Sequence, residues 1–190
     1  MRFDPDRHRR GSMRASWWDY AGCGAYFVTI CTHHRLTLFG DVVDGRVYLS
    51  PAGTMAAESW AAVPDRFSGI ALDAYVVMPN HLHGIVVVRT GRHDESHREQ
   101  SAVVVSGTSD GSLGRVIQAF KSLTTVAYGR GVREHGWQPF DGRLWQRNYY
   151  DHIIRNADEL GRVRAYIARN PARWAHDAEN PAIIRTNNPM

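Results

Sequence analysis

Residues 76–88 read VVMPNHLHGIVVV. Apolar residues flank the two histidines on both sides, and β-branched ones dominate the run after them, which is typical of a buried strand. Side chains at i and i+2 of a strand point to the same face, so His81 and His83 project together and Leu82 faces the other way. The pair is either two hydrogen-bonded core histidines or two ligands of one divalent metal ion. The spacing alone favours neither interpretation.

The length and the cysteine content restrict the class of protein. A chain of 190 residues fits one domain with a sizeable core. No apolar run approaches the roughly 20 residues that span a bilayer, and the N-terminus does not have the pattern of a signal peptide. Cys23 and Cys31 are too few and too close in sequence for a secreted disulfide framework. We therefore expect a reduced, cytoplasmic protein.

Nearly all of the positively charged side chains are arginines. The formal net charge is +4, and Lys121 is the single lysine. Arginine binds phosphate in a planar fork and stacks on bases, and the chain is rich in Trp and Tyr, which offer stacking surfaces to unpaired bases. This favours a nucleic-acid ligand. A genome rich in G and C also enriches arginine, and that explanation accounts for the shortage of lysine equally well.

The remaining pattern alternates strands with helices. Strands are predicted at 26–32, 42–43, 47–49, 72–78 and 85–88, with a further strand and its exit within 144–154. Helices are predicted to begin after Ser50, Ser112 and Asn156, the last one running from Ala157 to Asn170 and ended by Pro171. This order predicts an α+β fold, with helices packed on one face of an antiparallel sheet in a ferredoxin-like arrangement.

The domain boundaries follow from composition. Residues 1–24 form a basic N-terminal arm, and residues 25–182 form a single domain. Residues 91–111 are polar, with Gly and Ser clusters, and predict a mobile insertion. Residues 183–190 form a tail.

The last predicted helix adds a second group of polar residues. Arg162, Tyr166 and Asn170 are spaced at i, i+4 and i+8, so they share one face of that helix. A different face, formed by Leu160, Val163 and Ile167, should pack on the sheet. On spacing alone, a surface tyrosine and a C-terminal asparagine are the more ordinary interpretation. Together with a metal-binding pair, however, Asn170 could add an oxygen ligand and Tyr166 could attack a polarised phosphate.

Five blocks in order carry a resemblance to a known family: 24–32, 75–85, 120–122, 145–156 and 166–171. Over about Arg10 to Ala182 the chain resembles the IS200-like single-tyrosine transposases of the His-hydrophobe-His (HUH) class. It is most similar to the REP-associated tyrosine transposases. The resemblance implies that the single domain is a catalytic transposase domain with a ferredoxin-like fold, which cleaves and rejoins single-stranded DNA at REP-like hairpins.

The resemblance also implies roles for particular residues. His81 and His83 match the metal-binding pair, and Tyr166 matches the nucleophile that becomes linked to a DNA 5′ phosphate. Asn170 matches the third metal ligand, a position where the broader relatives usually carry the longer Gln. The metal expected from the family is Mg²⁺ or Mn²⁺, of which imidazole suits Mn²⁺ better.

The expected partner is single-stranded DNA with a hairpin, with no membrane involved. The cations expected to contact this DNA are Arg10, Arg14, Lys121, Arg147 and Arg162. Insertion-sequence relatives work as dimers and REP-associated members can act as monomers, so the sequence leaves a homodimer open.

Several other residues compete for these roles. Tyr149 and Tyr150 lack an Asn or Gln four residues on, and we interpret them as packing or base-stacking residues. Asp151-His152 and His33-His34 are adjacent pairs, whose side chains face opposite ways on a strand and so suit a shared metal poorly. Trp145 is expected in the core.

Three other functions compete with this interpretation. A histidine-triad phosphoesterase would place a third histidine at position 85, which is Ile85. An RNA-binding ferredoxin-like module would place exposed aromatic residues on the sheet face. A domesticated, catalytically inactive protein that binds a DNA hairpin is the remaining alternative, and the joint presence of His81, His83, Tyr166 and Asn170 argues for preserved chemistry.

Overall fold

The computed structural model describes residues 23–89 and 112–186. Residues 1–22 of the predicted basic arm, with Arg10 and Arg14, lie outside the described residues, and Gly24 at its predicted end belongs to the first strand. The predicted insertion near 91–111 and the last residues of the predicted tail also lie outside the described residues. Within the two described ranges, no helix combines the length and the apolar character needed to cross a membrane.

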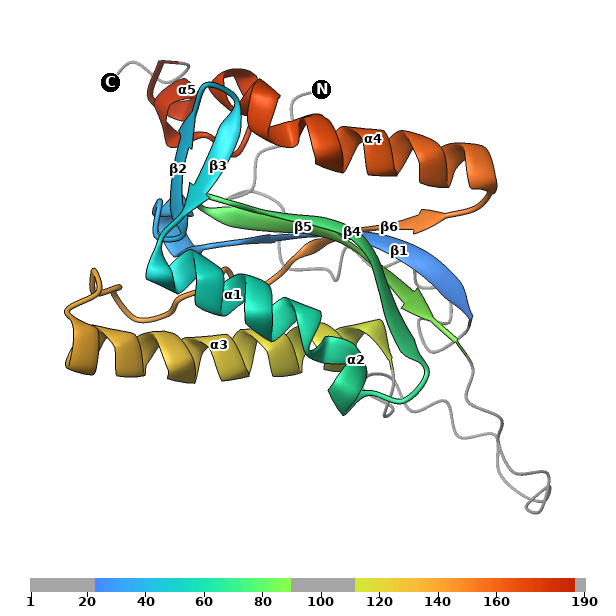
Figure 1. The fold of residues 1–190 in the computed structure, drawn as a ribbon, viewed down its shortest axis with the longest axis horizontal. Helices are drawn as coiled ribbons and strands as arrows, with labels where there is room; N and C mark the ends of the chain where they lie inside the picture. Colours follow the sequence, from blue (N-terminus) through green and yellow to red (C-terminus); the bar gives the residue numbers. More distant parts are fainter. Residues whose placement is uncertain (1–22, 90–111, 187–190) are drawn as a thin grey trace, which may run out of the picture.

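The centre of the fold is a four-stranded antiparallel sheet in the order β4-β5-β1-β6 (Figure 1). Its strands are β1 (Gly24–Cys31), β4 (Ile70–Met78), β5 (His81–Val88) and β6 (Tyr150–Ile154). A helix connects β1 to β4 and another connects β5 to β6, so the two central strands come from different β-α-β halves. This is the ferredoxin-like arrangement, and the predicted α+β class is confirmed.

The helices start where the sequence predicts. The elements outside the sheet are β2 (Gly40–Val43), β3 (Arg46–Leu49), α1 (Pro51–Ala61), α2 (Val63–Arg66), α3 (Leu113–His135), α4 (Ala157–Arg173) and α5 (Pro181–Thr186). The side chains of Ser50, Ser112 and Asn156 each accept a hydrogen bond from a backbone N–H three residues on. Each thereby satisfies a donor that the first helical turn leaves unpaired.

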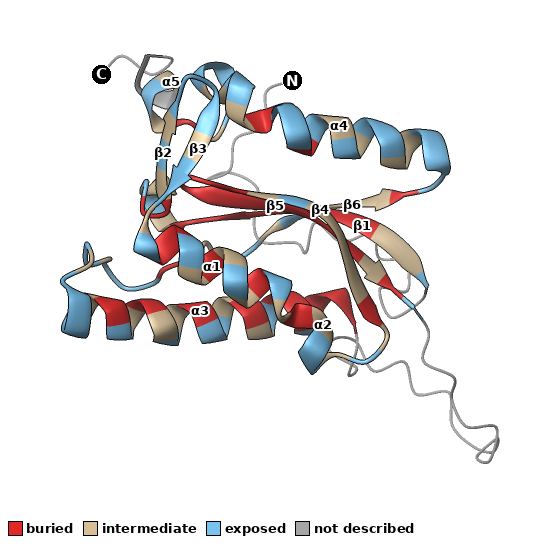
Figure 2. Cartoon of the chain, viewed as in Figure 1, coloured by how far each residue is buried: buried red, intermediate tan, exposed pale blue. Residues whose placement is uncertain are grey.

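One face of the sheet is covered by α1 and α3, and buried residues line that interface (Figures 1 and 2). The main core lies here and includes Trp60 of α1, Phe120 of α3 and Leu82 of β5. Trp145, also expected in the core, belongs to the same cluster and donates from Nε1 to Thr124 Oγ1.

The prediction that helices pack on one face of the sheet needs correcting. Helix α4 follows the last strand and lies on the opposite face (Figure 1). Its Ile167 packs with Phe27, Ile85 and Ile154 in a smaller second core. The apolar stripe of α4 has to be buried somewhere, and the face next to α1 and α3 is already occupied.

Pro171 does not end the helix predicted at 157–170. This helix, α4, continues to Arg173 before a 3-10 turn (Trp174–His176), and α5 follows it. The prediction was wrong because Pro171 lies within the final turn of α4, where losing one backbone donor costs less than it does in mid-helix. The extension keeps Asn170 helical, so it stays on the same face of α4 as Tyr166.

Candidate metal centre and active site

His81 and His83 lie on β5, beside Cys31 and Thr29 of β1, and both face α4. The tight connection between β4 and β5 places them immediately after Asn80. Both rings are buried, with exposed fractions of 0% and 2%. The predicted alternation is confirmed, because Leu82 between them packs in the core on the other side of the sheet.

The two rings point their outer nitrogens at one another. His81 Nε2 lies 3.1 Å from His83 Nε2, and the two Nδ1 atoms are bound elsewhere. His81 Nδ1 lies 2.8 Å from Asn80 Oδ1, and His83 Nδ1 lies 2.8 Å from Thr29 Oγ1. Nitrogen ligands each about 2.1 Å from one ion stand about 3 Å apart when they meet it near a right angle. Oxygen partners on the inner nitrogens are the usual support of metal-binding histidines.

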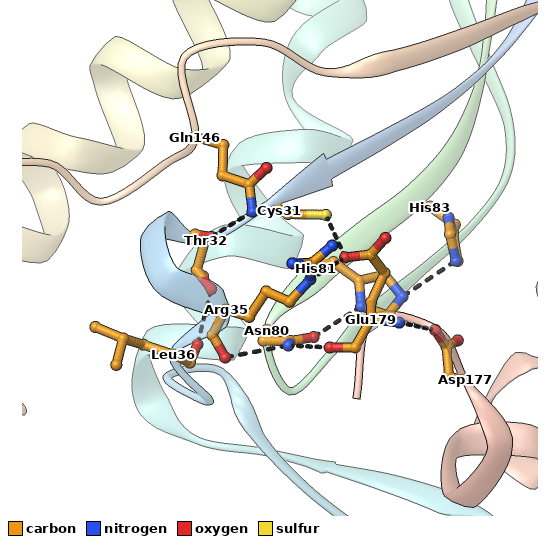
Figure 3. Close-up of polar contacts among 10 residues, drawn as sticks. All are labelled: Cys31, Thr32, Arg35, Leu36, Asn80, His81, His83, Gln146, Asp177 and Glu179. Carbon is orange, nitrogen blue, oxygen red and sulfur yellow. Dashed lines mark hydrogen bonds and ion pairs between the residues drawn. The ribbon is translucent and has the colours of Figure 1, made fainter. Parts of the chain in front are cut away.

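Asn80 fixes the protonation of the first ring. Its Nδ2 donates to the backbone carbonyls of Arg35 and Glu179 at 3.1 and 2.7 Å, so its Oδ1 must be the atom that faces His81 (Figure 3). An amide oxygen only accepts, so His81 Nδ1 carries the proton and the Nε2 lone pair is free to bind a cation.

Burial keeps both rings neutral. Burial lowers the pKa of His81 to about 3, and burial together with the neighbouring His81 lowers the pKa of His83 to about 3. At neutral pH both imidazoles are therefore uncharged, which is the form that binds a metal.

Tyr166 stands over this pair on α4. Its Oη lies 3.4 Å from His83 Nε2, and its ring meets Phe27 edge to face at 5.8 Å. The side chain is 43% exposed, so a substrate can reach it. Burial of its inner part, with the negative charge of Asp177, raises the pKa of Tyr166 above its usual value.

Asn170 follows one helical turn later and is 2% exposed. Its Nδ2 donates to Asp177 Oδ2 at 3.0 Å. Its Oδ1 is buried and has no hydrogen-bond partner among the described residues. A buried acceptor without a partner is costly, and a bound cation would satisfy it.

Asp177 is the residue of the site that sequence reasoning missed. One ligand atom each from His81, His83 and Asp177 lie within 4.8 Å of one another, so this group could hold a metal ion. The two carboxylates of Asp177-Ala178-Glu179, just beyond the last helix predicted from the sequence, were a visible sign. Nothing local in the sequence indicated that this segment returns to the histidines.

A cleft of about 940 Å³ opens beside these residues. Its walls include Phe27, Tyr149 and Tyr150, and two arginines, Arg35 and Arg173, contribute to its lining. Tyr150 is 48% exposed, so an aromatic surface is available next to the candidate nucleophile. The exposed ring of Tyr150 suits a ligand that has flat rings.

Two of the other cations predicted to contact DNA are exposed on the surface. Arg162 is exposed one turn before Tyr166, beside the same aromatic Phe27. Arg147 is exposed in the connection between α3 and β6.

Lys121 instead binds the protein itself. Its Nζ donates to the carbonyls of Gln146, Arg147 and Asn148 at 2.9, 3.4 and 3.0 Å. Burial lowers the pKa of Lys121 to about 8. Lys121 thereby holds the segment that supplies Gln146 and Asn148 to the cleft.

Known proteins share the sequence pattern and the fold of this chain. No family model matches the chain. An uncharacterized protein of Haemophilus influenzae is 32% identical over 174 residues, which cover 90% of this chain and 92% of that protein. The chain belongs to the same family as that protein.

A solved structure extends the comparison to the fold. It is the REP-associated tyrosine transposase bound to a REP hairpin, with a TM-score of 0.55 and 18% identity, covering 86% of this chain and 74% of that one. The chain shares the fold of that protein. The predicted resemblance is confirmed at this level.

Proposed function

We propose that this protein is a metal-dependent enzyme of the single-tyrosine transposase type. It cleaves and rejoins single-stranded DNA at REP-like hairpins through a covalent 5′-phosphotyrosine on Tyr166. The observation that carries the proposal is the 3.4 Å between Tyr166 Oη and His83 Nε2. It brings an accessible nucleophile next to two neutral imidazoles whose outer nitrogens face each other.

The residues present fit a divalent cation. His81 and His83 supply two nitrogens in their neutral form, and the unpartnered Oδ1 of Asn170 supplies an oxygen. When bound, Mg²⁺ or Mn²⁺ would supply a Lewis acid that draws negative charge from an oxygen of the scissile phosphate. The imidazole nitrogens favour Mn²⁺ over Mg²⁺.

Tyr166 carries the covalent step. Its raised pKa keeps the phenol protonated at neutral pH. As Oη bonds to phosphorus, the bond from phosphorus to the 3′ oxygen breaks, the phenol gives up its proton and the departing oxygen takes one up. The phosphotyrosine conserves the energy of the diester, so attack by a 3′ hydroxyl can reverse the step.

The aromatic residues of the cleft support a single-stranded substrate. Tyr150 offers an exposed aromatic ring and Tyr149 a half-buried one on which unpaired bases can stack, and stacked base pairs of a duplex cannot reach them. The similar solved protein is bound to a REP hairpin, and we extend that ligand to this chain. His81, His83, Tyr166 and Asn170 all come from one chain, so the proposed site needs no residue from a second copy.

The test of the nucleophile uses a single-stranded oligonucleotide that carries a hairpin, incubated with the full chain and Mn²⁺. A covalent adduct should appear on a denaturing gel with wild-type protein and be absent with Tyr166→Phe. Tyr150→Phe, in the same cleft, is the matched control and should still form the adduct. An adduct that persists in Tyr166→Phe rules out the assigned nucleophile.

A second experiment separates recognition from chemistry. His81→Ala should abolish cleavage and retain hairpin binding, because the histidines act on the scissile phosphate and not on the hairpin. Equal loss of both would identify the histidines as structural. Tight hairpin binding by wild type without any adduct would support the inactive hairpin-binding alternative, which the complete set of site residues does not favour.

A further inference from the structure

Asp177 is held against the histidine pair by a segment that is distant from it in sequence. Helix α4 ends at Arg173, and a 3-10 turn follows. Residues 177–180 then return to the end of the sheet where the central strand β5 begins (Figure 3). A carboxylate oxygen of Asp177 lies within 4.8 Å of a ring nitrogen of His81 and of His83.

Asn80 connects this segment to the first histidine. Its Oδ1 accepts from His81 Nδ1 at 2.8 Å, and its Nδ2 donates to the backbone carbonyl of Glu179 at 2.7 Å. The side chain of Glu179 pairs with Arg35 Nε at 2.6 Å (Figure 3). One asparagine therefore sets the His81 ring and also places the segment that carries Asp177.

Both oxygens of Asp177 are oriented by the protein. Oδ1 accepts from the backbone N–H of Glu179 at 2.7 Å, and Oδ2 accepts from Asn170 Nδ2 at 3.0 Å. A carboxylate offers about four acceptor positions, so lone pairs remain on both oxygens. The geometry of the carboxylate is thus fixed before any cation arrives.

The Asn170 amide gives an independent indication of a cation. Because its Nδ2 is used by Asp177, its Oδ1 is turned away from that carboxylate and is left buried without a partner among the residues described. The same contact therefore orients an oxygen that a metal would satisfy. Asn170 is short for this position, and the Asp177 contact fixes the direction in which its amide points.

We propose that Asp177 is a fourth protein ligand of the metal, beside His81, His83 and Asn170, and that it also orients the Asn170 amide. The inference rests on the proposed metal-dependent function. Two imidazoles and an amide form an uncharged site, whereas Mg²⁺ and Mn²⁺ are hard cations that prefer charged oxygen ligands. Asp177 supplies the negative charge and converts the set into two nitrogens and two oxygens.

The test measures Mn²⁺ binding by the full chain, by isothermal titration calorimetry and by the electron paramagnetic resonance signal of free Mn²⁺. Asp177→Asn keeps the shape of the side chain and removes its charge, and it should weaken Mn²⁺ binding about 10-fold or more. Glu179→Gln removes a neighbouring carboxylate that is not part of the ligand group, and should weaken binding less than about threefold. Unfolding of each variant in EDTA checks that it is folded.

The outcomes separate this inference from the proposed function. Mn²⁺ affinity of Asp177→Asn within twofold of wild type, or equal losses in Asp177→Asn and Glu179→Gln, would overturn the Asp177 role even if wild type forms the DNA adduct. A selective loss in Asp177→Asn supports it even if no adduct is ever found. Failure of wild type to bind Mn²⁺ at all would overturn both.

Discussion

The two faces of the sheet are formed by the same strands, but one carries the main apolar core and the other carries the candidate site. Toward α1 and α3 the strands present a continuous apolar core, in which Trp60 and Phe120 meet edge to face at 5.1 Å. Toward α4 the apolar cluster is small, and next to it lie two buried histidines and an open cleft. Strand β5 contributes to both faces, since Leu82 enters the large core and its neighbours enter the site.

The difference shows how a small domain can bury polar groups. The face next to α1 and α3 supplies most of the apolar burial, at roughly 25 cal/mol per Å² of apolar surface. The α4 face can then accommodate neutral histidines and an unpartnered amide oxygen. Gly84, which follows His83 on β5, allows Trp60 of α1 to pack closely on the sheet, because a Cβ there would lie 2.7 Å from the Trp60 ring.

The largest expected effect is a pH dependence of the free energy of unfolding, caused by the two histidines on the α4 face. The pKa values of His81 and His83 are about 3 in the folded protein and about 6.5 in the unfolded chain, so between these values the unfolded chain binds more protons. Stability should be fully present above pH 6.5 and fall as the pH drops toward 3. Without metal, the free energy of unfolding should decrease by about 5 kcal/mol from pH 7 to pH 4.5.

The check is chemical denaturation at both pH values in wild type and in the double variant His81→Gln/His83→Gln. The double variant should show a much flatter pH dependence. His135→Gln, at the exposed end of α3, should keep the dependence of wild type. An unchanged slope in the double variant would show that the acid sensitivity arises elsewhere.

The next largest effect is the loss of stability when a side chain of the main core is truncated. Trp60 is fully buried, and Trp60→Ala should leave a cavity and cost about 3–5 kcal/mol of the free energy of unfolding. Trp60→Phe should cost clearly less, because it keeps an aromatic ring and removes an indole N–H that has no partner among the described residues. Denaturant midpoints measure both. Equal costs for the two variants would contradict a tightly packed contact with Gly84.

The smallest effect concerns the start of α4. Asn156 Oδ1 accepts from the Glu159 backbone N–H at 2.9 Å, and Asn156→Ala should cost about 1 kcal/mol. Asn156→Asp keeps the cap and should cost little. Hydrogen exchange of the α4 amides, compared with those of α3, should show that the loss is confined to α4. A uniform loss over both helices would mean that the two faces unfold as one unit.

Much of the fold could be predicted from the sequence because the patterns that determine it are local. The caps at Ser50 and Ser112 and the alternation around Leu82 each depend on residues within a few positions of one another. The helical spacing of Tyr166 and Asn170 was equally local. The side of the sheet that α4 covers was not, because it depends on which face α1 and α3 already occupy.

The candidate site shows the same division. The histidine pair, the tyrosine and the asparagine were found as patterns. Their inner partners were not: Thr29 lies 54 positions from His83, and Asn80 binds the backbone of Glu179, 99 positions away. Lys121 was expected to contact DNA, yet its hydrogen bonds with carbonyls 25–27 residues away could not be deduced from its charge.

The sequence by itself determined the α+β class, the placement of His81 and His83 on one face of a strand, and the common face of Tyr166 and Asn170, because periodicity fixes where side chains point along an element. Only the tertiary structure decided that these two faces meet and that Asp177 joins them. Packing between distant segments sets those contacts. Such packing follows from which apolar surfaces remain to be covered, and no local pattern records it.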